Sequence, residues 1–113
     1  LMEGTNSDSP LVEIEAVVAR YLSDTPEICG VICASTKSAM AAVSAIEDMG
    51  LSVGKDVDVF SKEAIPFLKR FRKPILTVHE DVGTAGNFLA KAVMQRIADP
   101  TIPPMQGLET PKF

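Results

Sequence analysis

The sequence is short of several residue types, and each shortage excludes a class of protein. Its 113 residues include no tryptophan, one histidine and two cysteines, too few ligands for a structural zinc site, which takes four. Acidic residues outnumber basic ones by 15 to 11, whereas a general nucleic-acid binder is usually basic. No apolar run reaches membrane-spanning length, and no signal-peptide pattern opens the chain. We therefore expect no metal, no cofactor and no membrane contact.

The two cysteines lie in one short apolar segment, ICGVIC at 28–33. On a strand, Cys29 and Cys33 would share a face but sit ~13 Å apart, which is beyond the reach of a disulfide. The sequence therefore predicts two small buried thiols in a reducing compartment, which favours a cytoplasmic protein.

Apolar residues make up 46% of the chain, enough for one globular unit with a modest core. Charge is distributed unevenly along it. Residues 1–66 carry 11 acidic and 4 basic side chains, while residues 67–113 carry 4 acidic and 7 basic ones. The basic run within 69–73 is short, and we interpret it as a solvated surface rather than a nucleic-acid patch.

Apolar spacing predicts three helices. Ser9 and Pro10 begin the first, which runs to about residue 22; the second covers 36–49 and stops at Gly50; the third starts after Asp81 and stops at Asp99 and Pro100. Short apolar runs predict strands at 28–33, 57–60 and 75–78, with a Pro-containing turn in 63–73. Residues 1–3 read as the end of a further strand, and the tail 101–113 holds one edge strand at most.

This alternation of strands and helices predicts an α/β fold, a parallel sheet with helices on both faces. Ligands bind to such sheets beyond the carboxyl ends of the strands. The polar stretch Ser61-Lys62-Glu63, which follows the strand 57–60, is therefore the first candidate for a site.

Motifs for phosphate cradling and nucleophilic catalysis are missing. The glycines form neither GxGxxG nor a P-loop, and Ser35 lacks the glycines of a nucleophile elbow. Gly83 to Gly86 open the last helix, where small residues favour close packing over anion binding. His79, beside Glu80 and Asp81, is the one candidate general base. We do not expect an enzyme, and a small α/β enzyme using His79 stays open as an alternative.

Four segments together resemble the LacI/GalR family of bacterial transcription regulators. They are GVICAST at 30–36, AIEDMGL at 45–51, VGKDVDVFSKEA at 53–64 and PILTVHED at 74–81. The resemblance implies the C-terminal portion of a periplasmic-binding-protein-like type I effector domain. It assigns 1–73 to the C-terminal subdomain, 74–99 to a crossover strand and helix that pack on the N-terminal subdomain, and 100–113 to a return tail.

The sequence departs from the family pattern at the motifs that bind the ligand in that family. Ser35-Thr36 stands where the family has Asn-Asp, and Ser61-Lys62-Glu63-Ala64 stands where it has Gly-Phe-Asp-Asp. A glutamate still accepts hydrogen bonds from sugar hydroxyls, as such a pocket requires. By position, the resemblance implies effector-binding roles for six residues: Asn6, Ser35, Lys62, Glu63, Glu80 and Val82.

The resemblance also implies partners. Met40, Phe67, Arg70 and Phe71 match surfaces that the family uses to form homodimers. The implied function is a sugar-responsive transcription regulator, with polar substitutions similar to those of regulators of α-glucoside and disaccharide uptake. Operator DNA would be contacted only through an N-terminal helix-turn-helix headpiece, which these residues do not include. A periplasmic sugar-binding protein of a transporter is the alternative within the same fold.

Overall fold

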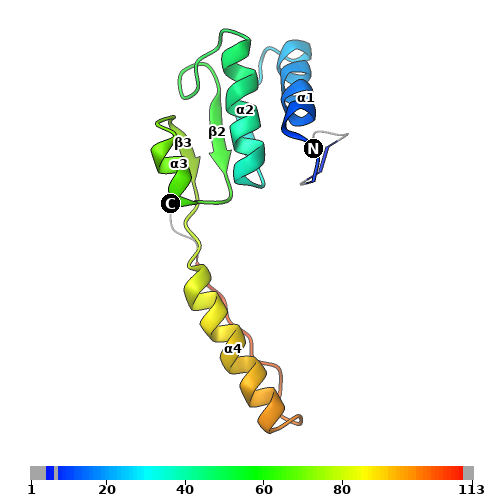
Figure 1. Cartoon of the computed structure of the whole chain (residues 1–113), viewed down its shortest axis with the longest axis vertical. Coiled ribbons are helices and arrows are strands. Elements are labelled where there is room, and N and C mark those ends of the chain that lie inside the picture. The colour runs from blue at the N-terminus through cyan, green and yellow to red at the C-terminus, as the bar shows by residue number, and fades with distance from the viewer. Residues whose placement is uncertain (1–4, 7, 111–113) are drawn as a thin grey trace. The chain divides into compact units, whose positions relative to one another are not determined.

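A computed structural model describes residues 5–6 and 8–110, which form a short parallel sheet and four helices (Figure 1). Contacts divide the chain into two compact units, one up to Val78 and one from His79 onward. The elements are α1 (Leu11–Asp24), β1 (Gly30–Cys33), α2 (Thr36–Asp48), β2 (Asp58–Ser61), α3 (Pro66–Arg70), β3 (Ile75–Thr77) and α4 (Val82–Ala98).

The three strands pair in the order β1-β2-β3, and all of them run parallel. Cys33 is opposite Ser61, and Ser61 is opposite Thr77, so the three carboxyl ends lie at one edge of the sheet. The predicted parallel α/β sheet is confirmed.

Helices α1 and α2 cover one face of this sheet, and α2 packs against both α1 and the strands β1 and β2. Four alanines of α2 are almost fully buried, which lets the neighbouring backbones approach closely: Ala39, Ala41, Ala42 and Ala45. Ile46 of α2 and Val59 of β2 are fully buried at the centre of this core.

The opposite face of the sheet carries an apolar row, Ile32, Phe60 and Leu76, whose members are register partners across the three strands. Ile32 is 83% exposed and Leu76 is 57% exposed. Parallel strands are normally buried on both faces. Within the first unit, no helix among the described residues covers this row.

Helix and strand ends differ locally from the prediction. Helix α1 begins at Leu11 with Pro10 as its N-cap, and the Ser9 hydroxyl accepts from the Asn6 amide instead of capping the helix. The turn predicted in 63–73 contains the five-residue helix α3, with Pro66 at its first position. No strand forms in 101–110, and the strand predicted at 1–3 lies outside the described residues.

Two glycines make the return from α2 to β2 possible. Gly50 follows the C-cap of α2 with a φ of 76°, as the sequence predicts, because glycine adopts this conformation without the Cβ clash. Gly54 has a φ of 78°, and a Cβ added there would lie 2.6 Å from Cγ of Pro74. Nearby, Lys73 pairs with Glu47 and ties the start of β3 to the end of α2.

The cysteine prediction is right for one thiol only. Cys33 is buried in the core, and burial raises its pKa to about 11. Cys29 is exposed because it precedes β1 and lies outside the packed part of the strand.

The second unit consists of α4 and the tail that runs along it (Figure 1). Gly107 of the tail passes so close to the Phe88 ring that a Cβ there would lie 3.2 Å from Cε2 and Cζ. No α4 residue is buried, and the large apolar side chains Leu89, Val93, Met94 and Ile97 are exposed. Within the described ranges, no helix is long and apolar enough to cross a membrane.

Candidate functional site

The candidate site lies at the carboxyl ends of β1 and β2. After Cys33, the last residue of β1, Ala34 and Ser35 lead into α2; after Ser61, the last residue of β2, the chain continues through Lys62 and Glu63. The register that pairs Cys33 with Ser61 brings these two connections together. Two segments separated by more than 20 positions in sequence therefore meet at the edge where α/β sheets bind ligands.

Ser35 is the N-cap of α2 and forms a capping box with Ser38. Its hydroxyl accepts from the Ser38 amide at 3.2 Å, and the Ser38 hydroxyl accepts from the Ser35 amide at 3.2 Å. The two hydroxyl oxygens are 2.8 Å apart. A hydroxyl offers one donor and two acceptor positions, so one position of Ser35 is left for a ligand.

Glu63 reaches the same helix end from β2. Its Oε2 accepts from the Thr36 amide at 2.8 Å. The backbone carbonyl of Glu63 accepts from the hydroxyl of Ser61 at 3.0 Å, and Ser61 is fully buried. A carboxylate at a helix N-terminus is stabilised by the free amides and by the helix dipole. The contact leaves Oε1 of the exposed Glu63 side chain for another partner.

Thr36, the first residue of α2, has a buried hydroxyl at this point. The residue is 8% exposed, and Oγ1 has no hydrogen-bond partner among the residues that the structure describes. A buried polar atom without a partner is costly and usually has an explanation such as a water or a ligand.

Lys62 lies between these groups in sequence, with its ammonium exposed and its backbone amide bound to the Cys33 carbonyl at 2.9 Å. Its side chain can donate to a hydroxyl of a bound molecule. The site thus combines a carboxylate, two hydroxyls and an ammonium at one strand edge, a set suited to binding a molecule with many hydroxyl groups.

Asn6 is not brought to this edge by any contact that the structure shows. Its Oδ1 accepts from the amides of Asp8 at 2.8 Å and Ser9 at 3.1 Å, so the side chain stabilises its own turn before α1. The effector-binding role that the resemblance implies for Asn6 stays a prediction.

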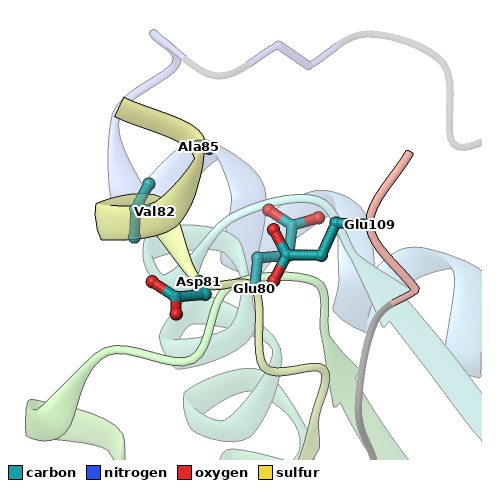
Figure 2. Close-up of a pocket in the computed structure, with 5 residues that line it drawn as sticks. All are labelled: Glu80, Asp81, Val82, Ala85 and Glu109. Atoms are coloured by element: carbon teal, nitrogen blue, oxygen red, sulfur yellow. The ribbon is translucent and has the colours of Figure 1, made fainter. Parts of the chain in front are cut away.

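Glu80 and Val82 line a pocket of about 200 Å³ within the second unit. Asp81, Ala85 and Glu109 complete its lining, with Glu109 contributed by the tail (Figure 2). Asp81 caps α4: Oδ1 accepts from the Thr84 amide at 2.9 Å, and Oδ2 accepts from the Thr84 hydroxyl at 2.9 Å. Both bonds hold the pKa of Asp81 below its ordinary value, and the bond from the Thr84 amide has the larger effect.

The four residues implied in dimerisation differ in exposure. Phe67 is 49% exposed and Arg70 is exposed, while Met40 and Phe71 are half-buried. The rings of Phe67 and Phe71 lie 6.2 Å apart at an angle of 31°, and Phe71 packs against the core. Phe67 and Arg70 are thus the members of this set that a partner would meet first.

The structure adds two residues, Thr36 and Glu109, that sequence reasoning did not assign to a site. Ser61 was in the candidate stretch, but only the structure shows that the Thr36 amide holds Glu63 and that the Ser61 hydroxyl orients it. Glu109 gave no signal, because its pocket partners are more than 20 positions away in sequence. Within residues 5–6 and 8–110, no three His, Cys, Asp or Glu side chains are placed to hold a metal ion.

This fold is that of a periplasmic binding protein-like domain. Residues 2–112 match the family described as periplasmic binding protein-like domain, and the chain belongs to that family. It is a domain that LacI-family helix-turn-helix regulators share, so the resemblance inferred from the four sequence segments is confirmed.

Curated relatives are helix-turn-helix regulators at low identity. The chain is 30% identical to the HTH-type transcriptional regulator AglR of Rhizobium meliloti over 94% of its length, covering 33% of that protein. It is 29% identical to the HTH-type transcriptional repressor PurR of Glaesserella parasuis over 73% of its length, and 28% identical to the HTH-type transcriptional regulator MalR of Streptomyces coelicolor over 74%. The chain spans a third or less of these relatives.

Proposed function

We propose that the chain is the effector-binding and dimerisation portion of a sugar-responsive transcription regulator that acts in the cytoplasm. The observation that carries the proposal is the meeting of Ser35 and Glu63 at the carboxyl ends of β1 and β2. The resemblance implies an effector-binding role for both residues, and the two segments that contain them are in contact. The names of the regulators that share the domain support the class of function.

In this proposal the effector's hydroxyls bind to Glu63 Oε1, the Ser35 hydroxyl and the Lys62 ammonium. Residues 1–73 form one subdomain, 74–99 cross to the other, and 100–113 return. The effector binds between the two subdomains and favours their closed arrangement, which changes the placement of DNA-binding segments in a dimer. Met40, Phe67, Arg70 and Phe71 contribute to that dimer. Glu80 and Val82 contribute from the crossover, and Asn6 from the loop before α1.

A calorimetric titration of the complete gene product with a panel of mono- and disaccharides tests the proposal. One or more sugars should bind, and Glu63→Ala should weaken binding about tenfold or more, because a buried hydroxyl loses its acceptor. Asp58→Ala is the matched control, since Asp58 is an exposed acid at the start of β2, the strand that leads to Glu63, and lies away from the site. The proposal is wrong if no sugar binds, or if both variants bind as tightly as the unchanged protein.

A further inference from the structure

The N-terminal amides of α2 already carry an anion supplied by the chain itself. The Thr36 amide donates to Glu63 Oε2, and the Ser38 amide donates to the Ser35 hydroxyl. The free N-terminus of a 13-residue helix would otherwise attract a phosphate or carboxylate through its amides and dipole. Glu63 comes from 27 positions away and is oriented by the fully buried Ser61, so a specific tertiary contact places this charge.

The same helix end also contains an unsatisfied hydrogen-bonding group, the buried hydroxyl of Thr36. Thr36 Oγ1 has no partner among the described residues, although the residue is more than nine-tenths buried. The amide of the same residue is satisfied by Glu63. A ligand at this helix end therefore lies beside a neutral hydroxyl that has almost no exposed surface, and it meets the Glu63 carboxylate where an anion would bind.

We propose that Glu63 is a specificity-determining residue that excludes anionic ligands, such as sugar phosphates and sugar acids, and admits uncharged hydroxylated ones. A second anion within a few ångströms of a carboxylate is disfavoured by enough to change binding tenfold or more. The Glu63 carboxylate is exposed but is held at the helix end by the Thr36 amide, whereas no hydrogen bond or ion pair among the described residues holds the exposed Lys62 ammonium there. The other nearby cation, Lys37 in the first turn of α2, is half-buried and already has a partner. This inference rests on the proposed function, because it names the charge class of ligand for the same site.

Replacement of Glu63 by glutamine tests the effect of the side chain's charge without changing its shape. Glutamine keeps the length of the side chain and an oxygen that can accept from the Thr36 amide, but it removes the negative charge. Helix α2 keeps the Ser35 capping box, so the variant should fold. Glu63→Ala serves as a second variant, and Asp58→Asn removes one negative charge from the other end of the same strand as a matched control.

Inorganic phosphate is the probe, followed by two-dimensional amide NMR of the protein and of each variant. The unchanged protein and Asp58→Asn should show no saturable shift of the Thr36 amide. Glu63→Gln and Glu63→Ala should bind phosphate at least about tenfold more tightly, and the amide shifts should be centred on the first turn of α2. Equal phosphate binding by all four proteins, no gain in either Glu63 variant, or a gain that leaves the Thr36 amide unmoved would overturn the inference. Failure of every sugar to bind would contradict the proposed function, but the comparison of phosphate binding among the four proteins would still test the role of Glu63.

Discussion

The carboxylate of Glu63 accepts a hydrogen bond of 2.8 Å from the backbone amide of Thr36. The bond joins the end of β2 to the first turn of α2 and brings the candidate ligand groups to one edge of the sheet. In the function that we propose, the same carboxylate selects the ligand by its charge.

Loss of the α2 cap should cost measurable stability. Ser35→Ala removes the hydroxyl that accepts from the Ser38 amide, so the free energy of unfolding should fall by about 1 kcal/mol. Ser44→Ala, in the middle of the same helix, should leave stability unchanged or raise it slightly, because alanine is the better helix former. Chemical denaturation measures both, and equal effects would contradict the capping role.

Two isoleucines allow the two faces of the sheet to be compared: Ile46 of α2 packs on the covered face, and Ile32 of β1 lies on the exposed face. Ile46→Ala empties a fully buried position and should cost about 2–5 kcal/mol. Ile32→Ala, at a side chain that is 83% exposed, should cost less than about 1 kcal/mol. A large loss at Ile32, measured by the same denaturant titration, would show that this face is covered in solution.

The two glycines with positive φ should respond differently to alanine. Gly50→Ala pays only the backbone cost, about 1 kcal/mol, because nothing lies within 4 Å of the added Cβ. Gly54→Ala adds a clash with Pro74 at 2.6 Å and should cost clearly more. Thermal unfolding of the two variants ranks them, and the reverse order would contradict the placement of Pro74 over Gly54.

The Asp81 cap of α4 should depend on pH. Because the folded state holds the pKa of Asp81 below its ordinary value of 3.8, the stabilisation is complete above pH 3.8 and is lost as the pH falls through the lower, folded value. A carboxyl NMR titration should therefore give a midpoint below 3.8. In Thr84→Val, which lacks the hydroxyl donor, the midpoint should move up towards 3.8; an unchanged midpoint would assign no role to that hydroxyl.

Sequence reasoning succeeded where a boundary has a local cause. Gly50 ends α2, Asp81 caps α4, and Asp99 with Pro100 stops it, because each of these residues acts on its immediate neighbours. The helix α3 was missed because five residues are too few to show an apolar period.

Contacts between residues far apart in the chain could not be predicted from the sequence. The segment ICGVIC predicts a strand covered on both faces, yet Ile32 is 83% exposed, since coverage depends on what packs there and not on the strand itself. Ser35 was named from the resemblance, and Glu63 from both the resemblance and its place after the strand 57–60. The Thr36 amide that binds Glu63 was not named, because the strand register decides that contact. Glu109 lines the same pocket as Glu80 because of the path of the tail, which carries no periodic signal.

The most direct test of the account is an amide NMR titration of the protein with an uncharged disaccharide that calorimetry has shown to bind. The account predicts saturable shifts at the amides of Thr36, Lys62 and Glu63, with the Thr36 shift reduced in Glu63→Ala and retained in Asp58→Ala. Binding that leaves the amides at the ends of β1 and β2 unmoved would contradict it.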